Sequence, residues 1–167
     1  QKEIGLDEVL ASPYVSNPLR LFEICPVSNG AAAVVICSAA KARQFTSQPV
    51  LVASSTVATM HFSDALPRGL AGPVPGGPSF HTESLAAVKW AFEMAGIGPK
   101  EIDVAQLQDT EAGAEIMHMA ENGFCEHGEQ EHMLANGETE INGRLPVNTD
   151  GGCLANGEPI GASGLRQ

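Results

Sequence analysis

The glycine-rich stretch 148–167, NTDGGCLANGEPIGASGLRQ, holds the residues of this chain that are best suited to bind a ligand. An extended segment leads into it, and its last residues have the composition of a helix. A glycine turn ahead of a helix presents free backbone N–H groups to an anion, or to a carbonyl oxygen that becomes one during reaction. The same glycines would serve equally well in a structural turn.

The spacing of these glycines excludes two common phosphate-binding motifs. Gly157, Gly161 and Gly164 follow the pattern GxxxGxxG, which differs from the GxGxxG fingerprint of dinucleotide-binding folds. No Gly-Lys-Ser/Thr sequence follows, as a P-loop would require. The pattern therefore indicates a binding loop without assigning a particular reaction.

Glu158 is a carboxylate among glycines, directly before Pro159 and the expected helix. Such a group can act as an acid or a base if it is partly removed from water. Alternatively, it complements the helix dipole from the first turn.

The cysteines and histidines give weaker signals. The cysteines form no CxxC pair, which favours free thiols over disulfides: Cys25, Cys37, Cys125 and Cys153. No histidine lies near Cys153 in the sequence, so a nucleophilic role is not expected for it. The stretch CEHGEQEH fits no usual zinc spacing, so we expect a polar loop there and no metal site. Nothing in the sequence selects the remaining histidines for catalysis: His61, His81 and His118.

The net charge of −11 is concentrated in one stretch. Between Lys100 and Arg144 there is no lysine or arginine, while Asp and Glu occur throughout. Such a surface repels phosphate backbones, so nucleic-acid binding is not expected. A solvated acidic face is the favoured interpretation, and a docking surface for a basic partner is the alternative.

The 167 residues, 43% hydrophobic and 17% charged, suffice for one soluble domain with a sizeable core. No apolar run approaches the roughly 18 residues of a membrane span. The N-terminus lacks the pattern of a signal peptide, so we expect a cytoplasmic protein. The chain does not begin with Met, and we expect the gene product to start upstream.

Strands that alternate with helices predict an α/β domain. The apolar run 31–38 predicts a strand buried on both faces. The other predicted strands are 49–58, 104–107 and 144–149. The predicted helices are 39–45, 82–96, 111–123 and a last one that opens near residue 161. We expect an ordered loop at 72–78, GPVPGGP, and a polar surface excursion at 125–143.

The helix predicted at 82–96 has Thr82 as its possible N-cap and Gly96 as its stop. Its apolar residues lie on two sides, which predicts substantial burial.

Four blocks of this sequence resemble, in order, the C-terminal part of a thiolase: NPLRLFEICPVSNGAAAVVICSAAKA, GPVPGGPSFHTESLAAVKWAFEMAGIGPKEIDVAQLQD, ENGFCEHGE and LPVNTDGGCLANGEPIGASGLRQ. The sterol-carrier-protein-X or lipid-transfer-protein branch, which is acetyl-CoA acetyltransferase-like, is the most similar. The resemblance implies an α/β thiolase-like fold of αβαβα layers with an incomplete C-terminal half. Residues 1–48 would form a tail with the closing strand and helix of the N-terminal half. Residues 49–167 would form the C-terminal domain, truncated in its central helix.

The resemblance also implies a function. The chain is similar to part of an acyl-CoA acyltransferase that acts on lipid- or steroid-like thioesters. Coenzyme A would be part of the substrate, and no other cofactor is implied. The family's nucleophilic cysteine would lie in the N-terminal half, and the second cysteine beyond Gln167, so the chain resembles a fragment that is inert alone. There are two alternatives: a retro-aldol lyase of the same branch, and a non-catalytic protein that binds acyl-CoA or acts as a scaffold. The implied partners are a further copy in a homo-oligomer and a small subunit with an OB-fold and a zinc ribbon.

Two positions depart from the thiolase pattern. Glu158 stands where the family carries the His of a Gly-His-Pro motif, and Gln108 stands where Asn or His opens the Asn-Glu-Ala-Phe or His-Asp-x-Phe motif. In the family these positions activate the nucleophile and build an oxyanion site, so the resemblance marks Glu158 and Gln108 as catalytic. An ionised Glu cannot donate to an oxyanion, so it would serve as a base, or burial would keep it protonated. Gln108 retains an N–H donor.

The resemblance extends to substrate-binding residues. The segment 69–76, GLAGPVPG, lies near the catalytic pocket in thiolases, although a rigid crossing loop is the alternative. The predicted substrate-binding residues are Ser28, Gly72, Pro73, Asp109, Gly152, Gly157 and Gly161.

Overall fold

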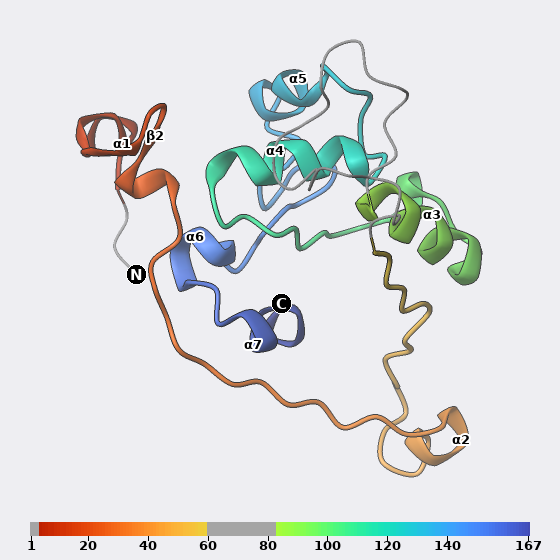
Figure 1. Cartoon of the computed structure of the whole chain (residues 1–167). Helices are drawn as coiled ribbons and strands as arrows, with labels where there is room; N and C mark the ends of the chain where they lie inside the picture. The colour runs from red at the N-terminus through yellow and green to blue at the C-terminus, as the bar shows by residue number, and fades with distance from the viewer. Residues whose placement is uncertain (1–3, 60–82) are drawn as a thin grey trace. The chain divides into compact units, whose positions relative to one another are not determined.

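The computed structural model describes residues 4–59 and 83–167 (Figure 1). The chain divides into two compact units, which we call the site unit (residues 1–32 and 100–167) and the middle unit (residues 33–99). The domain division predicted at residue 48 remains a prediction. The predictions made for Gly72, Pro73, Thr82 and the loop 72–78 fall on residues outside the described ranges.

The site unit begins with a small N-terminal substructure. A short helix is followed by a two-stranded antiparallel sheet and a 3-10 turn: α1 (Leu6–Ala11), β1 (Tyr14–Ser16), β2 (Leu19–Arg20) and η1 (Leu21–Glu23). The Arg20 guanidinium lies over the Tyr14 ring, 4.0 Å from its centroid, and donates to the carbonyl of Ser12. These contacts fold the first residues of the unit back on themselves.

The rest of the site unit contains four helices: α4 (Ala112–Glu121), α5 (Gln130–Ala135), α6 (Gly152–Asn156) and α7 (Ile160–Arg166). The helix predicted at 111–123 is confirmed as α4, and Gly123, with φ of 73°, lies just beyond its end. The helix predicted near residue 161 is confirmed as α7. In Figure 1, α6 and α7 follow one another at the blue C-terminal end of the chain.

The core of the site unit forms where two predicted strands meet. The segments 104–107 and 144–149 lie side by side in parallel, but their ladder is limited to one bridge between Ala105 and Val147. The buried residues around this bridge are Ala105, Leu107, Met119, Met133 and Leu145. Burial of these side chains holds α4 and α5 against the paired segments.

The segment 125–143, predicted to be a polar surface excursion, has a more ordered structure. It contains α5, and Met133 of this helix is only 4% exposed. Cys125 also packs against the core, and the N–H groups of Leu145 and Val147 donate to the carbonyls of Glu138 and Thr139, so several contacts attach this acidic segment.

The described part of the middle unit contains two α-helices: α2 (Ala39–Ala42) and α3 (Glu83–Ala95). Ser38 caps α2, since its Oγ accepts from the N–H of Lys41 at 3.3 Å. The helix predicted at 82–96 is confirmed as α3, and Gly96 follows it with φ of 71°. The predicted burial was wrong, because none of the residues of α3 is buried and Trp90 is 49% exposed.

The two β-rich runs of the sequence do not form the expected strands. Residues 31–38 and 49–58 have no ladder partner in the described chain. Val35 is 99% exposed and Val50 is 98% exposed. The prediction of a buried strand was wrong here because such a strand needs neighbours that pair with its backbone and cover its faces.

No helix within residues 4–59 and 83–167 has both the length and the apolar character needed to cross a bilayer.

Candidate functional site

The two residues predicted to be catalytic lie in direct contact. Gln108 Nε2 donates a hydrogen bond to Glu158 Oε1 at 2.5 Å, across 50 positions of sequence. Gln108 follows the paired segment 104–107, and Glu158 lies in the short linker between α6 and α7. Glu158 is half-buried and Gln108 is exposed, so the pair lies at the surface of the unit.

The linker that carries Glu158 is held tightly against the N-terminal part of the site unit. Gly157 has φ of 76°, and a side chain on it would overlap Ser28. On the other side, a side chain on Gly30 would approach Pro159 Cγ to 2.9 Å. Glycine at both positions therefore permits the close approach of two backbone segments.

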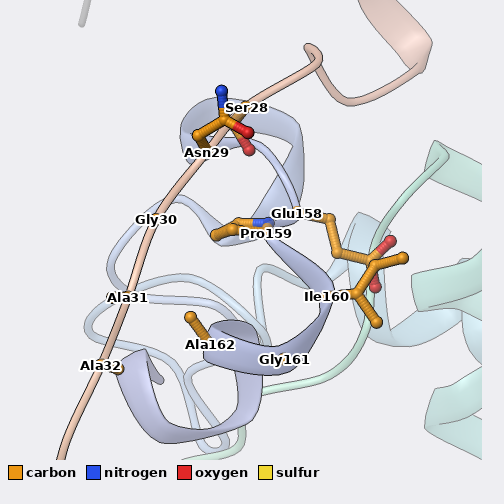
Figure 2. Close-up of a pocket in the computed structure, with 10 residues that line it drawn as sticks. All are labelled: Ser28, Asn29, Gly30, Ala31, Ala32, Glu158, Pro159, Ile160, Gly161 and Ala162. Carbon is orange, nitrogen blue, oxygen red and sulfur yellow. The ribbon is translucent and has the colours of Figure 1, made fainter.

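This approach creates a pocket of about 530 Å³ beside Glu158. Its walls are the segments 28–32 and 158–162, which Figure 2 shows facing one another. Pro159 points toward Gly30, whereas the side chain of Glu158 extends away from that wall (Figure 2). Ser28, Glu158 and Gly161 thus line one pocket, and their assignment to a common site remains a prediction.

Ser28 contributes a polar group to this pocket. Its Oγ is buried, and it has no hydrogen-bond partner within the described residues. A buried hydroxyl without a partner is costly, and Gly157 lies directly against this one.

Asp109 and Gly152 lie at the start of α6. Asp109 is 2% exposed, and its carboxylate accepts from the N–H of Cys153 at 2.5 Å and of Leu154 at 3.3 Å. A side chain on Gly152, which has φ of 60°, would overlap this carboxylate. Here the two residues fix α6, and neither lines the pocket. Their assignment to substrate binding remains a prediction.

Two thiols lie close to the acidic groups of the site. Burial, with Glu158, Asp109 and Glu111 nearby, raises the pKa of Cys25. Burial also raises the pKa of Cys153, and a hydrogen bond from the backbone of Asp109 only partly opposes this effect. Both thiols therefore stay protonated near neutral pH, a state that is unsuited to nucleophilic attack.

Residues 31 and 32, which form part of one pocket wall, were missed as site residues because the apolar run indicated a buried strand. Ile160 was also missed, and its apolar side chain carries no local signal for a site. The only available signal was the Ser-Asn-Gly turn before the apolar run.

Comparisons with known proteins give the family of this chain. Residues 79–167, more than half of the chain, match the family described as thiolase C-terminal domain-like. This chain belongs to the thiolase family. It is 35% identical to an acetyl-CoA acetyltransferase of Methanothermobacter thermautotrophicus, over 99% of this chain and 41% of that protein. It is 31% identical to human sterol carrier protein 2, over 100% of this chain and 30% of that protein.

A solved structure also resembles this thiolase-family chain. The Ltp2-ChsH2(DUF35) aldolase matches with a TM-score of 0.71 and 26% identity, over 90% of this chain and 38% of that one. The predicted partial thiolase-like α/β fold is therefore confirmed, as is the resemblance to the sterol-carrier-protein branch. The thiolase-family chain spans about two fifths or less of the length of these proteins.

Proposed function

We propose that this chain is part of an acyl-CoA acyltransferase that makes or breaks a carbon–carbon bond in lipid- or steroid-like thioesters, with Glu158 as the proton acceptor. The contact between Gln108 and Glu158 carries the proposal, because it joins the two positions that the family pattern marks as catalytic. Membership of the thiolase family supports acyl-CoA as the substrate class.

Gln108 would orient the carboxylate. Its amide N–H engages Oε1 of Glu158, and this leaves Oε2 to accept a proton from the substrate. An ionised carboxylate has no hydrogen to donate, so Glu158 cannot stabilise a developing oxyanion as an imidazolium could.

Ser28 would supply the donor that Glu158 lacks. Ser28 lines the same pocket as Glu158, and its Oγ has no partner in the described part of the chain. We assign it to the thioester carbonyl oxygen, with Gly161 forming the wall beside it. A carbonyl that gains negative charge would strengthen this hydrogen bond.

A retro-aldol acyl-CoA lyase is the second candidate, and two observations favour it. A carboxylate at position 158 suits removal of a hydroxyl proton, and the structure with TM-score 0.71 is named an aldolase. In this reaction Glu158 would take the proton of a β-hydroxyl group while the adjacent carbon–carbon bond breaks. The bond's electron pair would remain on the thioester product, whose α-carbon is then protonated.

The proposed partners follow the same likeness. The aldolase is named for two components, Ltp2 and ChsH2(DUF35). We extend to this protein the expectation of a small OB-fold and zinc-ribbon subunit, together with a homo-oligomeric state. Co-purification of the full-length protein with such a subunit would test the first expectation.

The decisive experiment is Glu158→Gln in the full-length protein, assayed for cleavage of 3-oxoacyl-CoA with free coenzyme A and of 3-hydroxyacyl-CoA without it. We expect kcat to fall by at least about tenfold, because a positioned base contributes about 10²–10⁴ in rate. Glu131→Gln, an exposed carboxylate on α5, is the matched control.

The two substrates separate the candidates. Cleavage that requires coenzyme A indicates acyl transfer, and cleavage without it indicates a lyase. An unchanged kcat in Glu158→Gln would remove Glu158 from the mechanism. Acyl-CoA binding without turnover in the wild-type protein would favour the non-catalytic alternative.

A further inference from the structure

Asn148 occupies an unusual backbone position at the junction between the core and the site. It is buried, and with φ of 49° it is the only non-glycine residue in the described ranges with a positive φ. Its N–H donates to the carbonyl of Ala105 at 3.0 Å, and its carbonyl accepts from Gly151 at 2.8 Å. Asparagine tolerates this left-handed conformation better than most residues, so the chain can turn here from the paired segment toward α6.

The side chain of Asn148 joins two further elements. Its Oδ1 accepts from the N–H of Leu107 at 2.8 Å, and its Nδ2 donates to Glu115 Oε2 at 2.7 Å. Leu107 is in the paired segment, and Glu115 is in α4. One buried amide therefore connects the segment 104–107, helix α4 and the turn that leads to α6.

The positions of Gln108 and Glu158 both depend on these connections. Gln108 directly follows Leu107, whose amide Asn148 holds in place. Glu158 follows α6, and α6 begins four residues after Asn148, with the amides of Cys153 and Leu154 bound by Asp109. A shift at Asn148 would therefore move Gln108 and Glu158 by separate routes.

We propose that Asn148 is a positioning residue of the site, which sets the Gln108–Glu158 contact through its paired hydrogen bonds to Leu107 and Glu115. The importance of Asn148 for catalysis rests on the proposed function, whereas its effect on the Gln108–Glu158 contact does not. Asn148 does not line the pocket, so it acts through Gln108 and Glu158 rather than on the substrate.

The hydrogen-bond pattern suggests a reciprocal exchange of side chains. Asn148→Asp keeps a residue that tolerates the left-handed conformation and keeps an acceptor for Leu107. It replaces the donor that faces Glu115 with an oxygen, so two carboxyl groups then meet. Adding Glu115→Gln to the same protein places an amide donor opposite the new carboxylate and restores a hydrogen bond between the two positions.

The experiment compares wild type, Asn148→Asp and the double variant Asn148→Asp/Glu115→Gln in the full-length protein. The first readout is the pair of side-chain amide NMR signals of Gln108, which reports its hydrogen bond to Glu158 without any substrate. The second readout is kcat and KM for the acyl-CoA substrates. Asn142→Asp, at an exposed position, is the matched control.

We expect Asn148→Asp to move the Gln108 signals to those of a solvated glutamine. It should lower kcat by at least about tenfold and change KM by less than about threefold, since loss of positioning affects the chemical step more than binding. The double variant should restore the signals and bring kcat to within about threefold of wild type. A residue with a merely structural role would change stability but leave the Gln108 signals unmoved.

Unchanged Gln108 signals in folded Asn148→Asp, or no recovery in the double variant, would overturn the inference. If Asn148→Asp does not fold, Asn148→Gly decides, because glycine keeps the turn and removes both side-chain hydrogen bonds. Retained Gln108 signals in that variant would also overturn it. If the wild type lacks activity toward acyl-CoA, the proposed function fails, whereas the NMR comparison still decides the role of Asn148.

Discussion

The buried carboxylate of Asp109 offers the sharpest test of how the site is held together. Asp109→Ala would leave the N–H groups of Cys153 and Leu154, in the first turn of α6, without their acceptor. Asp109→Asn would keep one acceptor oxygen but lose the charge and place an NH₂ group near these amides.

The expected loss can be estimated from the two contacts. The 2.5 Å bond from Cys153 is charge-assisted, and such a bond contributes about 1.5–3 kcal/mol. The 3.3 Å bond from Leu154 is longer, and we assign it about 0.5–1 kcal/mol. Asp109→Ala should therefore lower the free energy of unfolding by about 2–4 kcal/mol, and Asp109→Asn by about half as much.

Urea denaturation of the full-length protein, followed by circular dichroism, measures this loss as a shift of the unfolding midpoint at constant slope. Asp103→Ala removes an exposed carboxylate and is the matched control. If Asp109→Ala stayed within about 0.5 kcal/mol of wild type, where surface substitutions usually fall, the assignment of Asp109 to α6 would be wrong.

Two further predictions concern the linker and the core. Gly157→Ala should destabilise the protein by about 1–3 kcal/mol, because the residue has φ of 76° and no room for a side chain. Thermal unfolding measures this loss. Gly128→Ala is the control, because Gly128 also has a positive φ but has open space around it, so the comparison separates steric overlap from backbone strain. Burial raises the pKa of Glu115 above its ordinary 4.5, so its folded form binds more protons than its unfolded form. Its stabilising contribution is then complete below about pH 4.5 and is lost as the pH rises through the raised pKa. Glu115→Gln should reduce this decline in urea midpoints measured from pH 4 to 8, and an identical pH profile would show that Glu115 does not cause it.

Some features of the site could be predicted because their signals are local. The ends of α3 and α4 were found from Gly96 and Gly123, since a residue with positive φ stops a helix wherever the helix lies. Glu158 and Gln108 were found because each interrupts a short family motif with an unexpected side chain.

Other features could not be predicted because they depend on distant segments. The run 31–38 has the composition of a buried strand, but strand formation needs backbone partners that no local pattern supplies. Asn148 carries no sequence signal that distinguishes it from an ordinary turn residue. Its role is visible only when Leu107 and Glu115 lie on either side of its amide.

The sequence by itself determined the family, the principal helices and the two unusual polar residues of the site. These follow from chain-local properties: side-chain spacing, backbone preference and motif order. Only the tertiary structure decided that Gln108 meets Glu158, that Asp109 binds amides of α6, and that segments 28–32 and 158–162 line a pocket. Contact and burial are properties of pairs of segments, and the packing that removes a carboxylate or a hydroxyl from water fixes what that group can do.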